Sequence, residues 1–216
     1  MIISDNLKFI FIHNPRCAGM SIRTALQSLD TSNNYFSGYI HAEGKQLALM
    51  HLPMEQVMNY YPEVYDAMDH YFTFMVVRDP ITRFVSAFNR LHDKEYEGYL
   101  NFSKTYRDSL NGFIFTFNPE NLDNFTYQYR HFYRQRDMAY IGESCYADKI
   151  IRFESLKSDL EHMVWLNFPL HLALRPLKHL NARPVREPVT ELLTNHSIDK
   201  IRSWYEKDFE TFGYAC

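Results

Sequence analysis

The chain has few cysteines and no excess of basic residues, and both absences exclude classes of protein. Its three cysteines, Cys17, Cys145 and Cys216, are widely spaced and form no Cys-x-x-Cys pair, which argues against a disulfide framework and a cysteine zinc site. The net charge of −3 provides no basic field for general binding to nucleic acid or a membrane surface. We therefore expect a reducing compartment and no nucleic-acid or membrane partner. Any anionic ligand would be bound by individual residues near it and not by an overall positive charge.

Long apolar runs, repeats and linkers are also missing. The N-terminal stretch MIISDNLKFIFIHN contains only a short apolar run, well below the roughly 20 apolar residues of a membrane span, and it has no basic leader. No low-complexity or Pro/Gly/Ser-rich tract divides the chain. With 216 residues and 46% hydrophobic content, the chain is long enough to bury a core. We expect a cytoplasmic protein with a single domain over residues 1–216; its oligomeric state is left open.

Strand-like and helix-like patterns alternate along the chain. Buried strands are predicted over 7–13, 71–77 and 148–154, and helices over 21–29, 53–60, 81–92, 155–166 and 197–212. This alternation predicts an α/β fold, a P-loop-like sandwich with a mainly parallel central sheet flanked by helices. In such folds ligands bind at the carboxyl ends of the strands.

An aromatic-rich segment lies between the second and third predicted strands. Residues 94–136 are expected to form a helical insertion, a cap, with Leu122, Phe125, Tyr129 and Phe132 at helical spacing. Their rings would stack on a sugar or adenine in one interpretation. We favour the other, a packed core, because aromatic residues at helical spacing are more often buried.

The first strand ends in a loop of small residues that leads into a helix. In HNPRCAGMSI, residues 13–22, such a loop presents main-chain N–H groups and the positive end of the helix dipole to an anion. Arg16 lies inside the loop, and a guanidinium binds two oxygens of a phosphate or sulfonate together. The alternative is an ordinary turn with a solvated Arg16 and with Ser21 as a helix cap.

A second strand-to-helix junction repeats this pattern in VVRDPITRFVSAF, residues 76–88. It places Arg78 at the strand end and Ser86 further along the helix. Taken alone, Arg78 and Asp79 would form a local ion pair that caps the helix. Because both junctions belong to one predicted sheet, we expect a ligand with two separated anionic groups.

These residues resemble a known family. HNPRCAGMSI resembles the 5′-phosphosulfate loop of PAPS-dependent sulfotransferases, usually written HIPKTGGTS, and FTFMVVRDPITRFVSAF resembles their 3′-phosphate motif. DKIIRFESLKSDLEHM, LKHLNAR and WYEKDFETFGY are similar to later parts of the family, so nearly the whole chain is covered. The branch that sulfates carbohydrates is the most similar.

The resemblance implies a donor and its contacts. The donor is 3′-phosphoadenosine 5′-phosphosulfate (PAPS), and the product is the 3′,5′-bisphosphate PAP. Arg16 would assist departure of the bridging oxygen, and Arg78 and Ser86 would hold the 3′-phosphate, with help from Arg83. The 5′-phosphosulfate would be held by the loop residues Arg16, Cys17, Ala18, Gly19, Met20 and Ser21. Four of these depart from the family spelling (Arg16, Cys17, Ala18 and Met20 for Lys, Thr, Gly and a hydroxyl residue), so the loop relies on main-chain donors.

Transfer of the sulfuryl group to a hydroxyl or amine requires a base for the acceptor's proton. A histidine, with a pKa of about 6.5, suits this task near neutral pH. His51 is our candidate, since related carbohydrate sulfotransferases carry a histidine between the two donor motifs, and His41 is the reserve. The alternative for His51 is a cap on the helix at Pro53. Weaker candidates for the cleft lining are Gln128, Lys178, His179 and Asn181.

Two other functions stay open. A P-loop kinase or NTPase would use Asp79 for magnesium, but the first loop lacks the G-x-x-x-x-G-K-[ST] spelling. A non-catalytic PAP- or PAPS-binding relative is the third class. No metal site is predicted, and the acceptor, a small molecule or a saccharide, is not specified by these residues.

Overall fold

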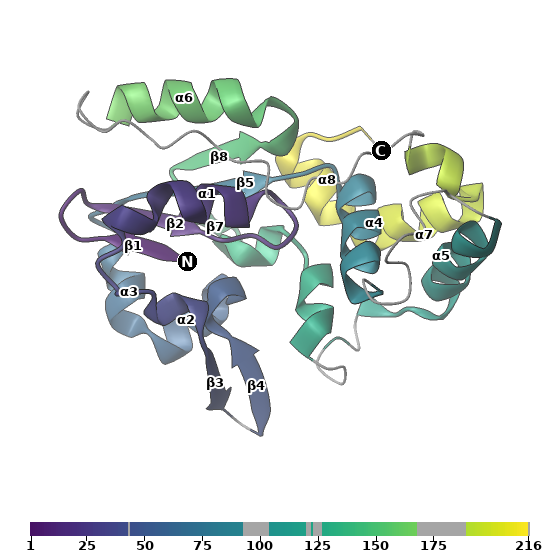
Figure 1. Ribbon diagram of the computed structural model, residues 1–216, viewed down its shortest axis with the longest axis horizontal. Helices are drawn as coiled ribbons and strands as arrows, with labels where there is room; N and C mark the ends of the chain where they lie inside the picture. The colour runs from purple at the N-terminus through teal and green to yellow at the C-terminus, as the bar shows by residue number, and fades with distance from the viewer. Residues whose placement is uncertain (43, 93–103, 120–121, 123–126, 168–188, 216) are drawn as a thin grey trace. The chain divides into compact units, whose positions relative to one another are not determined.

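The computed structural model describes residues 1–42, 44–92, 104–119, 122, 127–167 and 189–215, and its centre is a four-stranded sheet (Figure 1). The chain divides into two units. Unit 1 comprises Met1–Val77 with Gln135–Leu180, and unit 2 comprises Arg78–Arg134 with Asn181–Cys216. The sheet belongs to unit 1.

The sheet has the order β1-β2-β5-β8. Strands β2 (Phe9–Ile12), β5 (Phe72–Val77) and β8 (Lys149–Arg152) are parallel, and β1 (Ile2–Ser4) pairs with β2 in the antiparallel direction. All of β2 and most of β5 are buried, as expected for parallel strands covered on both faces. The three strands and the mainly parallel sheet predicted from the sequence are confirmed.

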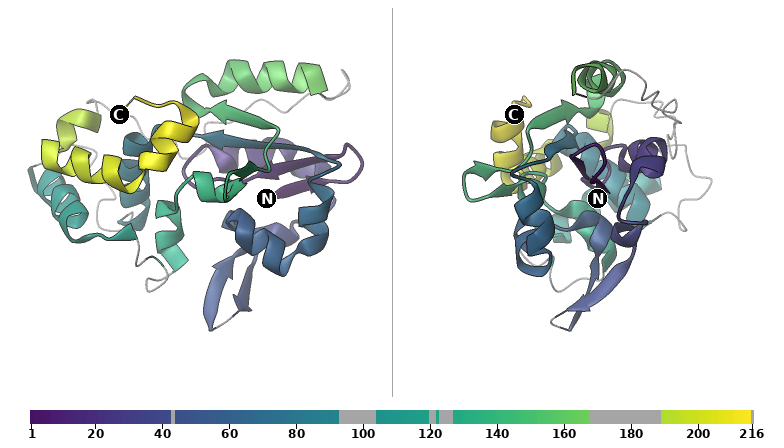
Figure 2. Two further views of the ribbon diagram at one scale, coloured as in Figure 1. Left: turned by 180° about the vertical axis from the view of Figure 1, so that it is seen from behind. Right: turned by 90° about the vertical axis from the view of Figure 1, so that its left-hand side faces the viewer.

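Helices cover this sheet. Helices α1 (Gly19–Leu26) and α6 (Leu156–Asn167) lie on one face, where Ile22, Leu26 and Leu160 join a core with sheet residues. The sheet residues of this core are Ile2, Phe9, Phe11, Phe74, Val76 and Ile151. Helices α2 (Met54–Tyr60) and α3 (Pro62–Ala67) lie on the side away from α6 (Figure 2). This arrangement is the α/β sandwich that the sequence predicts.

Two hairpins in unit 1 were not predicted. Strands β3 (Tyr39–Ala42) and β4 (Lys45–Ala48) form one, and β6 (Tyr140–Ile141) and β7 (Ser144–Cys145) form the other. The first hairpin continues directly into the 3₁₀ turn η3 (Leu49–His51), where Leu49 N–H donates to the Gly38 carbonyl at 3.1 Å. The hairpin therefore fixes the start of the turn that carries His51. The remaining 3₁₀ turns of unit 1 are η1 (Gln27–Leu29), η2 (Tyr35–Ser37), η6 (Arg136–Met138) and η7 (Phe153–Ser155).

Unit 2 is helical and has an aromatic core. Its elements are α4 (Pro80–Leu91), α5 (Lys104–Thr116), η5 (Tyr127–Phe132), η8 (Val189–Leu192), α7 (Asn195–Trp204) and α8 (Glu206–Phe212). Phe84, Phe117, Phe132 and Phe209 are buried in one cluster. The described part of the aromatic segment thus shares a core with α4 and the C-terminal helices, which favours the packing interpretation of its rings. Phe125 lies outside the described residues.

The prediction of one helix over 197–212 was wrong, because the chain turns at Tyr205. This residue has φ −114° and ψ 22°, outside the helical range, and it separates α7 from α8. Its ring is fully buried, and its hydroxyl donates to the Phe132 carbonyl at 2.7 Å. Gly213, with φ 63°, ends α8 as a left-handed cap, and this end was predicted. Within the described ranges, every helix is too short or too polar to span a bilayer.

Candidate functional site

The loop between β2 and α1 holds two non-glycine residues in the left-handed conformation. Arg16 has φ 64° and Ala18 has φ 59°, each at a cost of about 1–2 kcal/mol. Alternation of left-handed and right-handed residues turns successive N–H groups toward one side, as in the anion-binding concavities of other proteins. Gly19 begins α1, whose first N–H groups have no acceptor within the helix. The anion site stays a prediction, which this backbone conformation supports.

The side chains of this loop point in different directions. Arg16 is half-buried, Met20 is 44% exposed and Ser21 is buried. Cys17 is 1% exposed and belongs to the core between the sheet and α1. Its thiol faces the protein interior, so Cys17 would contribute its main-chain N–H to a ligand and not its sulfur.

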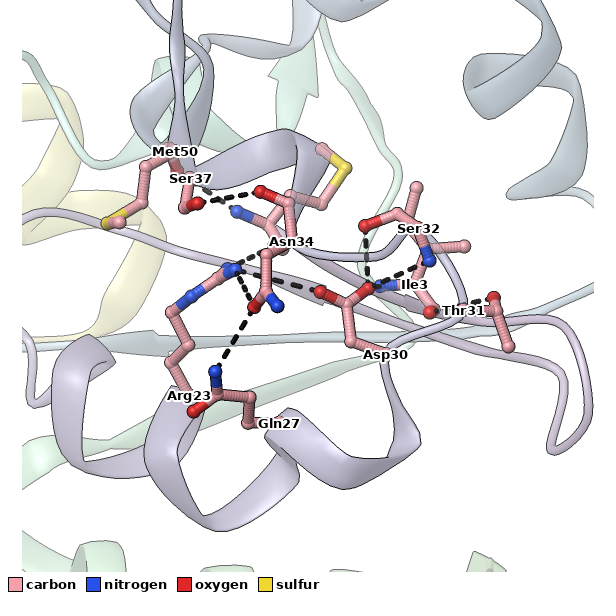
Figure 3. A network of polar contacts seen from close by, with 10 residues as sticks. Ile3, Arg23, Gln27, Asp30, Thr31, Ser32, Asn34, Ser37 and Met50 are labelled. Atoms are coloured by element: carbon pink, nitrogen blue, oxygen red, sulfur yellow. Dashed lines mark hydrogen bonds and ion pairs between the residues drawn. The ribbon is translucent and has the colours of Figure 1, made fainter.

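The far end of α1 is held by a buried polar network centred on Arg23 (Figure 3). Its guanidinium donates to the Met1 carbonyl at 2.7 Å and to Oδ1 of Asn34 at 3.1 Å, and it lies 3.6 Å from the Asp30 carboxylate. Burial lowers the pKa of Arg23, and the charge of Asp30 partly offsets this effect. The network fixes the helix that follows the predicted anion loop.

His13 packs against the start of this helix. A Cβ atom built on Gly19 would lie 1.9 Å from both Cδ2 and Nε2 of the His13 ring, so only glycine leaves room for the ring. His13 is 3% exposed. His13 follows the last residue of β2, and its ring closely contacts Gly19 of the predicted anion loop.

His51 is joined to the same loop. Its Nδ1 lies 2.9 Å from the His13 carbonyl oxygen, and the two imidazole rings meet edge-on with centroids 4.7 Å apart. Because a carbonyl only accepts, Nδ1 carries the proton, and the lone pair of the neutral ring is on Nε2. His51 is 8% exposed. Its alternative role as a cap is not seen, since α2 has Pro53 at its N-cap and no side-chain cap bond.

His41, the reserve candidate, has a different setting. It lies on β3, opposite Gln46 of β4, and is exposed. In the described residues it is a hairpin side chain, whereas His51 is bonded to the loop itself.

Arg78 precedes α4, and Ser86 lies on one side of this helix. Arg78 Nε donates to the Thr82 hydroxyl at 3.1 Å, and the Asp79 carboxylate caps the helix by accepting from Thr82 N–H at 2.8 Å. Thr82 and Ser86 are four residues apart and so share a helix face. Both are half-buried, whereas the residues between them are buried. Thr82 therefore orients the guanidinium on the face that carries Ser86.

The structure contradicts the suggested help from Arg83 in phosphate binding. Arg83 is 1% exposed, and its terminal nitrogens donate to the carbonyls of His131 at 3.1 Å and Tyr133 at 2.6 Å. The guanidinium carbon lies 5.4 Å from the Tyr205 ring centre. Arg83 thus links segments inside unit 2 and is turned away from ligands in solvent.

Other predictions fall outside the description, and some contacts were not predicted. Lys178, His179, Asn181 and the side chain of Gln128 lie outside the described residues. The contact between Thr82 and Arg78 could be predicted from the sequence, because the two residues are four positions apart. Asn14 and Gln135, which touch beneath the loop, have no such local signal. In the described ranges no group of three His, Cys, Asp or Glu side chains is arranged to hold a metal ion.

Comparison with known proteins agrees with this geometry. A family model described as the sulfotransferase family matches residues 1–215. Searches of curated proteins and of solved structures returned no match. Since the family match extends over nearly the entire sequence and includes both strand-to-helix junctions, the chain belongs to the sulfotransferase family.

Proposed function

We propose that the protein transfers the sulfuryl group from PAPS to a hydroxyl or amine of an acceptor. Membership of the sulfotransferase family supports the reaction class. The observation that carries the assignment of residues is the 2.9 Å bond between His51 Nδ1 and the His13 carbonyl. It joins a histidine, with its lone pair on Nε2, to a loop shaped for an anion.

The loop residues are suited to the 5′ end of the donor. Arg16 offers a guanidinium, and the N–H groups of residues 17–20 offer neutral donors that need no metal ion; the N–H of Ser21 donates to the Ala18 carbonyl at 2.9 Å. Donors fixed in place before the reaction stabilise charge that develops in the transition state. Arg16 and these N–H groups would stabilise the charge that grows on the oxygen joining the sulfuryl group to the 5′-phosphate.

The face of α4 is suited to the 3′ end. Arg78, oriented by Thr82, and the hydroxyl of Ser86 would bind the 3′-phosphate. Asp79 is used as the helix cap, which disfavours the magnesium role that a kinase would give it.

His51 would act as the general base. PAPS supplies the sulfuryl group and leaves as PAP. The acceptor oxygen or nitrogen forms a bond to sulfur while the bond from sulfur to the 5′-phosphate oxygen breaks, and Nε2 of His51 takes the acceptor's proton. In-line transfer of this kind depends on positioning and charge stabilisation.

The acceptor class and the location are also proposals. The resemblance of both motifs to the carbohydrate branch makes saccharides the first acceptors to test, before phenols and amines. The free thiols of Cys17 and Cys145 support a reducing location, the cytoplasm.

Calorimetry separates the three functions. We expect PAP to bind in the presence of EDTA, and ATP with magnesium to bind much more weakly. Preference for ATP with magnesium, lost on chelation, would favour the kinase. Binding of PAP without turnover of radiolabelled PAPS on any sugar, phenol or amine would favour the non-catalytic relative. The turnover assay on His41→Ala tests the reserve base.

A further inference from the structure

Gln135 lies beneath the anion loop, although it is far from the loop in sequence. Its side chain is fully buried. Its Oε1 is 3.1 Å from Nδ2 of Asn14 and 3.4 Å from the thiol of Cys17. One amide oxygen with two lone pairs therefore accepts from both residues.

Asn14 extends this contact to the sheet. It is 1% exposed, and its Nδ2 also donates to the Val76 carbonyl at 2.9 Å. Strand β2 ends at Ile12, which pairs with Met75 of β5. The side-chain amide of Asn14 therefore bonds to β5 just beyond the last main-chain pair of the two strands. Both N–H bonds of Asn14 have defined acceptors, and its orientation follows from them.

Cys17 is the point at which the loop itself is held. It lies between Arg16 and Ala18, the two left-handed residues. Its thiol sulfur lies 3.4 Å from the Pro15 carbonyl oxygen and 3.4 Å from Oε1 of Gln135. Both of these acceptors lie on the interior side of the loop. Conformations such as those of Arg16 and Ala18 persist when surrounding contacts determine them.

We infer that Gln135 is a positioning residue for the donor loop. Through Asn14 and Cys17 it holds the main-chain N–H groups of residues 17–20 in the arrangement that receives the 5′-phosphosulfate. The inference rests on the proposed function. It also gives a role to Cys17, whose thiol donates to Oε1 of Gln135.

A pair of ligands isolates this role from simple stability. PAP carries a 5′-phosphate and a 3′-phosphate, whereas adenosine 3′-phosphate lacks the 5′ group. A loop that loses its arrangement should weaken PAP and leave adenosine 3′-phosphate unchanged. A role in folding alone would lower the melting temperature and leave the ratio of the two dissociation constants as in the wild type.

Calorimetry on the full chain tests the inference with Gln135→Met, which keeps the length of the side chain and removes Oε1. We expect the PAP dissociation constant to rise about tenfold, equivalent to about 1.4 kcal/mol, and that of adenosine 3′-phosphate to stay within about twofold. Cys17→Val should act in the same direction. Its matched control Cys17→Thr, which has the shape of valine and restores a hydroxyl donor, should lose less PAP affinity than Cys17→Val.

The combination of variants completes the test. In the Gln135→Met background, Cys17→Val should add no further loss, because its partner is already gone. If Gln135→Met does not fold, the Cys17→Val and Cys17→Thr pair decides. Equal effects of the variants on both ligands, or no effect on PAP, would overturn the inference. The proposed function would still stand in that case if the wild type binds PAP. A wild type that binds neither ligand would overturn both.

Discussion

Replacing Gly19 with alanine should disturb His13 and, through it, His51. The added Cβ would lie 1.9 Å from two atoms of the His13 ring, far inside van der Waals contact. The ring has little room to move, because it is buried between Phe11, with ring centres 5.8 Å apart, and His51, with ring centres 4.7 Å apart. The clash is therefore transmitted to the imidazole proposed as the base.

The size of the effect follows from two opposing terms. Overpacking of a buried site costs about 1–3 kcal/mol, and replacing glycine by alanine in a helix gains about 0.5–1 kcal/mol. Because contacts of 1.9 Å are a severe clash, the upper half of the overpacking range applies, and a net loss of about 1–2 kcal/mol remains. In a chain of this size each kcal/mol shifts the melting temperature by about 2–4 °C, so we expect Gly19→Ala to melt about 2–8 °C lower.

Differential scanning calorimetry with a matched control measures this effect. Gly112 lies in α5, and a Cβ built on it meets nothing within 4 Å, so Gly112→Ala should raise the melting temperature. In a His13→Ala background the ring is absent, and Gly19→Ala should no longer destabilise. If Gly19→Ala stabilises the wild type as much as Gly112→Ala does, the placement of His13 against the loop is refuted.

Three other predictions concern the donor, the base and the response to pH. Arg78→Ala should weaken PAP at least about tenfold, because a charged hydrogen bond contributes about 1.5–3 kcal/mol, and should spare adenosine 5′-phosphosulfate, which lacks the 3′-phosphate; Thr82→Val should do the same to a lesser degree. Equal losses for both ligands in calorimetry would remove Arg78 from this role. His51→Ala should leave the PAP dissociation constant unchanged and lower turnover of radiolabelled PAPS at least about 100-fold; a folded, fully active variant would contradict the assignment. The hydrogen bond with Tyr146 raises the pKa of Tyr65 from 10.0 to about 12, so its stabilising effect is present below pH 10 and is lost as the pH rises toward about 12. Urea unfolding of Tyr65→Phe should accordingly depend less on pH in that window, and an unchanged dependence would argue against the contact.

Local patterns in the sequence predict most of the sheet and its flanking helices. The runs at 7–13 and 71–77 are apolar and bounded by polar residues, and they correspond to β2 and β5. Helix α4 begins at Pro80, with Asp79 as its cap, both of which are local signals. The turn at Tyr205 could not be predicted in this way, because the packing of its ring in unit 2 overrides the helical spacing.

The same distinction applies to the candidate site. The loop residues are consecutive, so Arg16 and Gly19 are recognisable from their spelling and spacing. The partners of the loop are not, because Gln135 is separated by 121 residues from Asn14 and by 118 residues from Cys17. Arg83 shows the opposite error. The family resemblance implied a ligand contact for it, whereas its position on α4 directs it to the carbonyls of His131 and Tyr133.

The left-handed conformation of Ala18 has a consequence for protein engineering. At φ 59°, the methyl group of Ala18 strains the folded backbone by about 1–2 kcal/mol, and a glycine would remove this strain. The greater freedom of glycine in the unfolded chain would destabilise the fold by only about 0.4–1 kcal/mol. Ala18→Gly should therefore be neutral or stabilising. A directed-evolution library built on this chain would therefore find tolerance to glycine in the middle of the proposed donor loop.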